Sequence, residues 1–418
     1  MDRFEIEGGK PLSGSVGISG SKNATLPLMA AALLAKGTTI IDNIPGLQDI
    51  YTMSMVLRVI GAQVKVEEGR MEIDCSNCNF WEAPYELVRK MRASFYVMGP
   101  LLARFGKAKV SLPGGCNLGP RPVDQHLKAF DLLGCKIRME EGYILVETDG
   151  MKGSQIDFDI ASVGATGNVM MAATAAEGTT ILENAACEPE IVDLADMLNA
   201  MGAKISGTGT SRITIEGPTE LHAVNWKVIP DRIETGTFMI AAGITKGYIT
   251  INNSRNDQVD VMVSKLRAAN TSVEVNDETI TVDARNANLK PVDIIAAPYP
   301  AFPTDLQAPW TSLMTIANGS SSITDTVYKE RFNHVPELNR LGADVRMGHT
   351  NAIVHGVKHL KAASVMCSDI RAGAGMVLAA LAAEGVTEVL RIYHIDRGYD
   401  NFEGKLKALG ARIRRVRE

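Results

Sequence analysis

Six stretches of small and apolar residues recur along the chain, and each ends at a glycine that leads into a run of β-branched residues. A helix that is apolar nearly all round must be buried on all sides, so each stretch predicts a buried helix followed by a strand. The six glycines, which stand 66 to 72 residues apart, are Gly37, Gly106, Gly178, Gly247, Gly319 and Gly385.

A second pattern runs in step with the first and predicts six helices that lie on a surface. The first of them has apolar residues at helical spacing, at Ile50, Met53, Val56, Leu57 and Ile60. Five of the six helices end at glycine and one ends at asparagine, the other residue that tolerates a left-handed helix end. These terminal residues are Gly61, Gly134, Gly202, Asn270, Gly342 and Gly410.

The two patterns together predict six repeats of about 70 residues, each reading helix, strand, helix, strand. Because six buried helices are too many for one core, we expect two domains of three repeats. The expected fold is an inside-out α/β barrel in each domain, with buried helices inside and sheets outside. One domain is expected at 22–229, and the other at 230–418, closed by the N-terminal strand in 1–21. The connection 226–230 is the expected hinge.

Composition and charge narrow the class of protein. The chain is 45% hydrophobic and 22% charged, which is typical of a globular protein, and its formal net charge is −5. An acidic chain is a poor candidate for non-specific nucleic-acid binding. The N-terminus lacks the pattern of a signal peptide, and the longest apolar run, 26–35, is too short to span a membrane. We therefore expect a cytoplasmic protein. The sequence does not determine the oligomeric state, for which a monomer is favoured.

Several kinds of site are disfavoured by the absence of their motifs. The six cysteines are scattered and do not form a disulfide framework. Cys75 and Cys78 make one CxxC, with no second CxxC or histidine pair at zinc spacing, so coincidence competes with a structural or redox role. The chain has no HExxH, no GxxxxGK[ST] and no GxGxxG that opens a βαβ unit. No metal and no cofactor is therefore predicted.

The segment 111–124 is the strongest candidate for chemistry. It places Cys116 among three glycines and three prolines, and Arg121 follows closely. A nearby cation favours the thiolate, and a loop of this composition can act as a lid. The competing interpretation is a surface loop with an incidental cysteine.

Cationic residues stand at the starts of several buried helices. Lys22 and Asn23 begin the first, where free backbone N–H groups suit an anion, although a solvated lysine is equally compatible. Arg92, Arg232 and Arg371 recur at equivalent positions, where arginine opposes the helix dipole. An anionic ligand is one explanation, and pairing with Glu234 or Asp369 is the other.

Further candidates follow the strands of the last two repeats. Arg331 and Arg397 lie just after these strands, where loops gather. Asp305 stands at the start of the fifth buried helix. It is either an N-cap or, facing a site rich in cations, a general base.

Nine strings along the chain carry a further signal. In order, they are SGSKNATLP, MRASFYVMGPL, LPGGC, GPRPVD, ASVGAT, PDRIETGTF, AFPTDLQA, ERFNHVPEL and IYHIDRGY. Together they resemble the UDP-N-acetylglucosamine enolpyruvyl transferase family of the EPSP synthase superfamily, and the resemblance covers essentially the whole chain. The shikimate-pathway relatives lack the LPGGC string.

The resemblance implies an enzyme that transfers the enolpyruvyl group of phosphoenolpyruvate to the 3-hydroxyl of UDP-N-acetylglucosamine, the first committed step of peptidoglycan synthesis. It implies that Cys116 protonates the methylene carbon and forms a covalent adduct, including with an epoxide phosphonate of the fosfomycin type. Asp305 would take the proton of the sugar hydroxyl. Both substrates are anions, so their charge would draw the two domains together.

The resemblance also implies a set of binding residues. The phosphate of phosphoenolpyruvate would bind Lys22, Arg121 and Arg397, and its carboxylate would lie near Arg331 and Arg371. The sugar would contact Asn23, Arg92, Asp305 and Val327. The uridine would contact Arg121, Pro122, Val123, Asp124 and Gln125, and the diphosphate would contact Ser162, Val163 and Gly164.

Two positions depart from the family pattern, and two alternatives remain. Ile160 replaces a lysine found in some members, and Gln125 replaces an apolar residue, so that contact is expected through its backbone. A shikimate-pathway enzyme is disfavoured by Cys116 and the run that begins at Arg121. A non-catalytic nucleotide-sugar sensor is disfavoured because Cys116 and Asp305 are both present.

Overall fold

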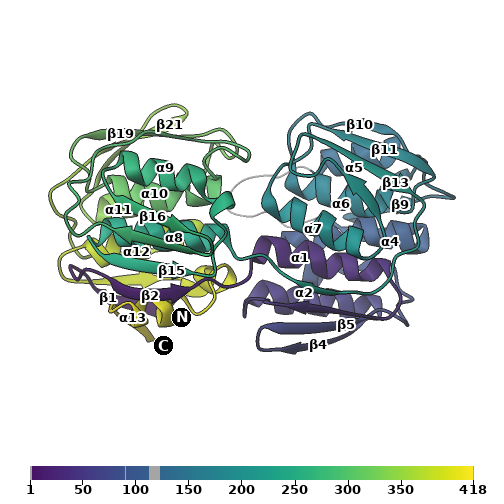
Figure 1. The fold of residues 1–418 in the computed structure, drawn as a ribbon, viewed down its shortest axis with the longest axis horizontal. Coiled ribbons are helices and arrows are strands. Elements are labelled where there is room, and N and C mark those ends of the chain that lie inside the picture. Colours follow the sequence, from purple (N-terminus) through teal and green to yellow (C-terminus); the bar gives the residue numbers. More distant parts are fainter. Residues whose placement is uncertain (1, 90, 113–122, 418) are drawn as a thin grey trace. The chain divides into compact units, whose positions relative to one another are not determined.

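The computed structural model describes residues 2–89, 91–112 and 123–417 (Figure 1). Contacts between residues divide the chain into two compact units. Unit 1 consists of Met1–Ser19 and Pro230–Glu418, and unit 2 consists of Gly20–Ile229. No helix in the described ranges is long and apolar enough to cross a membrane.

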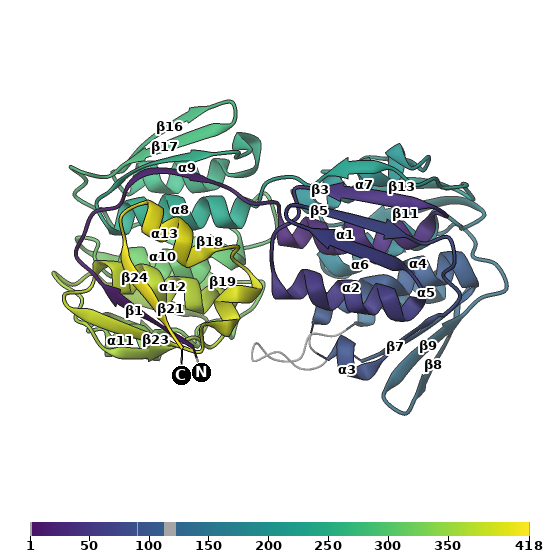
Figure 2. The ribbon, with the colours of Figure 1, turned by 90° about the horizontal axis from the view of Figure 1, so that it is seen from below.

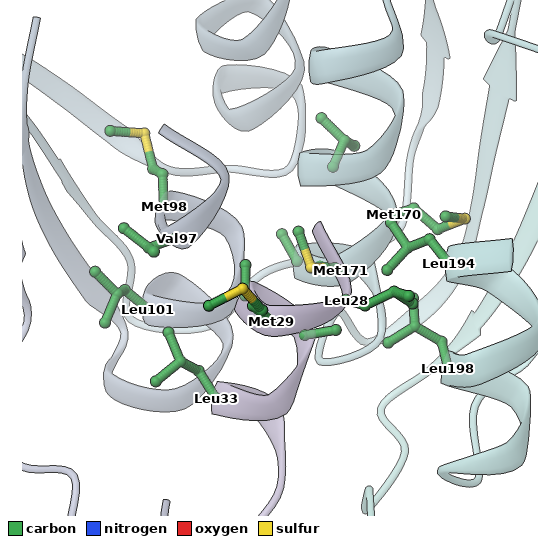
Figure 3. Packing of buried hydrophobic residues seen from close by; sticks show 14 of the residues in the cluster. Leu28, Met29, Leu33, Val97, Met98, Leu101, Met170, Met171, Leu194 and Leu198 are labelled. Carbon is green, nitrogen blue, oxygen red and sulfur yellow. The ribbon is translucent and has the colours of Figure 1, made fainter. Parts of the chain in front are cut away.

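Three buried helices form the centre of unit 2. They are α1 (Lys22–Ala31), α4 (Met98–Phe105) and α6 (Val163–Ala173); η1 (Ala32–Leu34) extends α1 and η2 (Arg92–Val97) precedes α4. All nine residues from Ala165 to Ala173 are buried, as expected for a helix that is apolar all round. Figure 3 shows Met29, Met98 and Met171 in this core, where flexible methionines fill the space between the helices.

Three four-stranded sheets belong to unit 2, and in each the first two strands are parallel while the other pairs are antiparallel. The first is β14 (Asn225–Lys227), β3 (Thr38–Asp42), β5 (Arg70–Asp74) and β4 (Gln63–Glu67). The second is β6 (Glu82–Ala83), β7 (Lys107–Ser111), β9 (Tyr143–Glu147) and β8 (Lys136–Glu140). The third is β10 (Gln155–Asp157), β11 (Gly178–Glu183), β13 (Arg212–Gly217) and β12 (Lys204–Ser206).

Helices with one apolar face complete unit 2. They are α2 (Gln48–Ile60), α5 (Asp124–Leu132) and α7 (Pro189–Ala200), with the short α3 (Tyr85–Val88). In α2 the predicted apolar stripe is buried, whereas Tyr51 and Val59 on the other face are exposed. The stripe therefore fixes which side of the helix packs on the core.

Unit 1 has the same plan. Its buried helices are α8 (Arg232–Ile244), α10 (Gln307–Met314), which follows η4 (Thr304–Leu306), and α12 (Ile370–Ala382). Its outer helices are α9 (Asp260–Ala268), α11 (Val335–Arg340) and α13 (Phe402–Ala408). Two short 3₁₀ helices are η3 (Asn256–Gln258) and η5 (Ile392–Arg397).

The sheets of unit 1 incorporate both strands of the N-terminal segment (Figure 2). The first sheet is β2 (Ser13–Gly17), β15 (Tyr248–Asn252), β17 (Thr279–Asp283) and β16 (Ser272–Asn276). The second is β18 (Ile294–Ala296), β19 (Ser320–Asp325), β21 (Asn351–His355) and β20 (Asp344–Met347). The third is β22 (Ser364–Met366), β23 (Val386–Leu390), β1 (Arg3–Glu7) and β24 (Arg412–Val416). In this sheet β1 pairs antiparallel with β23 and with β24.

These sheets and buried helices confirm the expected α/β fold class. All six predicted ends of the outer helices adopt positive φ, including Asn270 at 67°. Of the glycines after the buried helices, Gly247 is the exception, because the positive φ falls on Lys246 instead. Gly247 is needed for a different reason: a Cβ atom there would collide with the backbone of Leu12.

The connection expected as a hinge at 226–230 begins with two residues of a strand, β14. Trp226 lies in β14, which pairs with β3, and its indole Nε1 donates to Asp193 Oδ1 at 3.0 Å. The sequence did not reveal this strand because three residues are too few to show an alternating pattern. The chain passes between the two units at residues 19–20 and 229–230. Beside these points, Ser21 N donates to the Ile229 carbonyl at 2.8 Å, and Asp231 N donates to the Ser19 carbonyl at 2.9 Å.

Candidate active site

A shared carboxylate between two buried guanidinium groups is the main feature of unit 1. Asp305 Oδ1 lies 2.8 Å from Arg331 Nη1, and Asp305 Oδ2 lies 2.9 Å from Arg371 Nη2. The Arg331 and Arg371 side chains are buried, but 24% of the Asp305 side chain is exposed. The carboxylate is thus the member of this cluster that a molecule from solution can reach.

Neighbouring groups hold Arg331 in place. Arg331 Nη1 also donates to Thr304 Oγ1 at 3.0 Å, and the Thr304 hydroxyl donates to Asp325 Oδ2 at 2.6 Å. The other oxygen of Asp325 accepts from the backbone N–H groups of Val327 and Tyr328. Burial raises the pKa of the Asp325 carboxyl, and the hydrogen bond from Thr304 opposes that rise.

Arg371 is fixed from its own helix and from a ring. Its backbone N–H donates to Asp369, the N-cap of α12, at 2.9 Å, and its guanidinium lies 5.2 Å from the ring centre of Tyr399. Burial lowers the pKa of Arg371, but Asp305, Tyr399 and Asp231 together raise it by more, so the guanidinium remains protonated.

Both arginines keep hydrogen-bonding capacity. In the described part of the chain, Arg331 Nε and Arg371 Nη1 are buried nitrogens with no hydrogen-bond partner. A buried donor without a partner costs free energy, and an anionic ligand would satisfy it. The cluster can therefore hold a carboxylate or phosphate beside Asp305.

In unit 2, Lys22 begins the buried helix α1, and its ammonium lies 3.4 Å from Asp49 on α2. Both side chains are almost fully buried, so each charge needs the other. Ser21 caps the helix by accepting from the Ala24 N–H. Asn23 follows Lys22 in the same first turn.

The start of α6 forms a second group in unit 2. Ser162 is its N-cap, and Val163 and Gly164 are its first residues. A Cβ atom at Gly164 would lie 3.2 Å from His126 Nε2, so the imidazole packs directly on this turn. Burial lowers the pKa of His126 to about 3, with a further contribution from Arg92, so the ring is neutral. Free N–H groups at a helix start favour an anion.

Comparison with known proteins decides the family. The profile of the family described as EPSP synthase (3-phosphoshikimate 1-carboxyvinyltransferase) matches residues 6–406. The chain is 54% identical to the UDP-N-acetylglucosamine 1-carboxyvinyltransferase of Chloroherpeton thalassium, over 99% of this chain and 97% of that protein. It belongs to the EPSP synthase family. The UDP-N-acetylglucosamine 1-carboxyvinyltransferase of Salmonella arizonae is 51% identical to it over the full length of both chains.

Solved structures agree with this placement in the EPSP synthase family. The enolpyruvyl transferase NikO from Streptomyces tendae matches with a TM-score of 0.90 and 27% identity, over 99% of each chain. EPSP synthase from Acinetobacter baumannii, at 18% identity and a TM-score of 0.77 over the full length of both chains, shares the fold. The chain is thus an enzyme, as its sequence indicated.

Some residues expected from the family resemblance lie outside the described residues, namely Cys116, Arg121 and Pro122. Val123 and Asp124 are the first described residues after them, and Asp124 begins α5. The Gln125 side chain is already engaged, because its Oε1 accepts from the Asp159 backbone N–H and its Nε2 donates to Asp159 Oδ2, both at 2.9 Å. Ile160 is exposed.

Two interpretations of single residues need correction. Asp305 is not an N-cap, because Pro303 and Leu306 occupy the cap positions of η4 and α10. Asp369 was one of the two explanations offered for Arg371, the other being an anionic ligand, but Asp369 caps α12, and Asp305 pairs with the arginine. For Arg371 the decisive partner is thus 66 positions away in the sequence and not two.

Other expected residues lie elsewhere in unit 1. Arg397 ends η5, which packs on the first turns of α12. Arg232 lies over the Tyr299 ring at 5.4 Å, while its suggested partner Glu234 binds Lys405. Among the described residues, no three His, Cys, Asp or Glu side chains gather as metal ligands.

Sequence reasoning missed Asp49 and Asp325, which position Lys22 and Arg331. Asp49 had a signal: it lies four residues before Met53, on the apolar face of α2, where a charged residue is buried only with a partner. Asp325 had no such signal in the sequence, because an acidic residue at the end of a strand is more often exposed to solvent than paired with a buried cation.

Proposed function

We propose that this chain transfers the enolpyruvyl group of phosphoenolpyruvate to the 3-hydroxyl of UDP-N-acetylglucosamine and releases phosphate. The observation that carries the proposal is the partly exposed Asp305 between two buried arginines with unused nitrogens. The names of relatives that match over the full length support the choice of substrates. We place the reaction at the entry to peptidoglycan synthesis, in the cytoplasm.

Asp305 is the proposed general base. It takes the proton of the sugar 3-hydroxyl while the oxygen attacks C2 of phosphoenolpyruvate. The methylene carbon receives its proton from the thiol of Cys116, and the product of this addition is a tetrahedral ketal. Loss of a proton from the newly formed methyl group, together with departure of phosphate, then forms the enol ether. An acid and a base on separate residues are needed because the two protons move at different atoms.

The remaining roles concern charge. Arg331 and Arg371 are proposed to hold the carboxylate of phosphoenolpyruvate, and Lys22, Arg121 and Arg397 its phosphate. Arginine suits this task because its guanidinium binds carboxylate and phosphate in bidentate fashion. The carboxylate of phosphoenolpyruvate would satisfy the buried nitrogens that lack a partner in the described residues.

The UDP-sugar is proposed to bind two further groups. Asn23, Arg92 and Val327 contact the sugar, and Ser162, Val163 and Gly164 bind the diphosphate at the start of α6. The uridine contacts Arg121, Pro122, Val123, Asp124 and Gln125. Because the Gln125 side chain is bound to Asp159, its contact is through the backbone.

Phosphate release from the two substrates tests the proposal. Wild-type protein should release phosphate only when both substrates are present. Cys116→Ser should lower turnover by about 10² or more, the usual contribution of a general acid, and leave UDP-sugar affinity unchanged. The matched control is Cys187→Ser, on a half-buried cysteine outside these sites, which should retain turnover. Loss of UDP-sugar binding in Cys116→Ser would contradict the acid role, and no phosphate release by folded wild-type protein would contradict the function.

A further inference from the structure

A pair of cysteines in unit 2 lies outside every role proposed above. Cys75 follows β5 directly, and Cys78 comes three residues later at the end of a turn. The Cys78 N–H donates to the Cys75 carbonyl at 3.4 Å and closes this turn. A turn of this kind brings its first and fourth Cα atoms within about 7 Å, the range in which a disulfide can form.

The surrounding backbone fixes both cysteines. The Cys75 N–H donates to the Gly37 carbonyl at 3.0 Å, and the Cys75 carbonyl accepts from Arg104 Nη2 at 2.6 Å. On the other side of the turn, the Phe80 N–H donates to the Ile60 carbonyl at the end of α2. The two sulfur atoms are therefore held near each other by elements that do not depend on them.

The two thiols also differ in character. The neighbouring Cys78 raises the pKa of Cys75, and burial adds to that rise. The neighbouring Cys75 lowers the pKa of Cys78, and the charge of Arg104 contributes to this lowering, while burial opposes it. Cys75 is fully buried, whereas Cys78 retains 8% exposure. Cys78 thus has the features of an attacking thiolate, and Cys75 those of the thiol that resolves its adduct.

We propose that Cys75 and Cys78 form a redox-active dithiol that small-molecule disulfides convert reversibly into an intramolecular disulfide. The Cys78 thiolate attacks one sulfur of the reagent, forms a mixed disulfide and expels one thiolate. Cys75 then loses its proton to solvent and attacks Cys78 Sγ, so the S–S bond closes and the second thiolate leaves. The protein loses two electrons and two protons, and one disulfide reagent becomes two thiols.

The other described cysteines provide the contrast. Burial raises the pKa of Cys135 to about 11, and burial also raises the pKa of Cys187 and of Cys367. Each of these thiols is therefore less ionised than a free cysteine, and none of them has the lowered pKa of Cys78. Selectivity for the pair at 75 and 78 among the described cysteines is therefore expected.

Peptide mapping of the full-length folded protein tests the proposal. The protein is treated with hydroxyethyl disulfide, denatured, alkylated with N-ethylmaleimide and digested with trypsin. The fragment 71–89 ends at Arg89 and contains only these two cysteines. We expect this fragment without label and lighter by two hydrogen atoms, and we expect both labels to return after dithiothreitol. A doubly alkylated fragment, or a lasting mixed disulfide in wild-type protein, would overturn the proposal.

Two variants separate the roles of the thiols. Cys75→Ser should retain the hydroxyethyl adduct on Cys78, because no thiol remains to resolve it. Cys78→Ser should leave Cys75 unmodified until the protein is denatured, because Cys75 is buried. Thermal unfolding of each variant establishes that it is folded. If a variant does not fold, the mass of fragment 71–89 from the wild-type protein still shows whether the disulfide forms. The opposite pattern of adducts would refute the assigned order of attack.

Discussion

At the scale of single residues, one carboxylate balances two guanidinium groups. Asp305 pairs with Arg331 and Arg371, whose side chains are buried. Removal of one partner from a buried ion pair leaves an uncompensated charge, which costs more than the pair itself contributes. A substitution at Asp305 therefore affects the positions of both arginines as well as proton transfer.

Asp305→Asn should lower the rate of phosphate release by about 10² to 10⁴, the range typical of a general base. The amide keeps the size of the side chain but cannot accept the sugar proton. Asp344→Asn is the matched control, because Asp344 pairs with the exposed Arg346 in β20 and should retain activity. Steady-state kinetics of both variants provide the measurement. Activity within two-fold of wild type in Asp305→Asn would exclude the base role.

Glu234 gives a prediction about pH. Burial raises its pKa to about 7 from 4.5, opposed by Lys405 and by the Ser19 N–H. Between these two pH values the folded protein holds a proton that the unfolded chain releases, so this group's contribution to stability falls as pH rises through the interval. The difference corresponds to roughly 3 kcal/mol.

Glu234→Gln should therefore show a weaker fall of the free energy of unfolding between about pH 4.5 and 7 than wild type does. Urea unfolding at a series of pH values measures it, with the exposed Glu278→Gln as control. Parallel curves for wild type and Glu234→Gln would show that Glu234 does not titrate in this range.

The sequence indicated which charged residues belong to the candidate site, but it did not indicate which of them pair with each other. Arg371 was singled out because a positive charge at a helix start needs compensation, and Asp305 because an acid at a helix start can be an N-cap or, in a site rich in cations, a general base. Their pairing was not predictable, since 66 residues separate them and the nearer Asp369 was an equally good candidate. Cys116 and Arg121 stay predictions, because they lie outside the described residues.

At the scale of elements, close backbone approaches decide which substitutions are tolerated. Gly20 lies at the crossing into unit 2, and a Cβ atom there would collide with the carbonyl oxygen of Asn43 and lie 2.9 Å from its carbonyl carbon. Asn43 is itself held, because its side chain donates to the Val228 carbonyl at 2.9 Å. The backbone cannot move away without breaking this contact.

Gly20→Ala should lower the free energy of unfolding by about 3 kcal/mol or more, the upper part of the range for overpacking. Gly17→Ala, three residues earlier in β2, is the matched control, because a Cβ atom there meets nothing within 4 Å. Thermal and urea unfolding of the two variants give the comparison. Equal stability of the two variants would mean that the backbone at Asn43 moves to make room for the new Cβ atom at little cost in free energy.

The elements themselves were largely predictable. An all-round apolar pattern indicates a buried helix because no polar face is left for solvent, and α6 and α12 follow this rule. The strand β14 was not predictable, because its three residues pair in parallel with β3, far away in the sequence.

At the scale of the whole molecule, each unit depends on a strand contributed by a distant segment. In unit 1, β1 lies between β23 and β24, and β2 pairs with β15. In unit 2, β14 supplies the edge strand beside β3. Such pairings between distant segments are not encoded in any local pattern, so strand order could not be read from periodicity.

A fragment of residues 20–229 should unfold cooperatively by circular dichroism, since it contains every strand of the unit 2 sheets. A fragment of residues 230–418 should not, because it lacks β1 and β2, and addition of a peptide of residues 2–19 should restore a cooperative transition. Cooperative unfolding of 230–418 without the peptide would show that these strands are dispensable for stability.

The central position of β1 has a consequence for biosynthesis. β1 is synthesised about 400 residues before the strand it pairs with, because Arg3–Glu7 lies against Arg412–Val416. The nascent chain can complete residues 20–229 before the partners of β1 exist, and β1 exposes unpaired strand edges until β23 and β24 have been synthesised. Slow or interrupted translation would prolong the time in which this early segment is open to aggregation or chaperone binding.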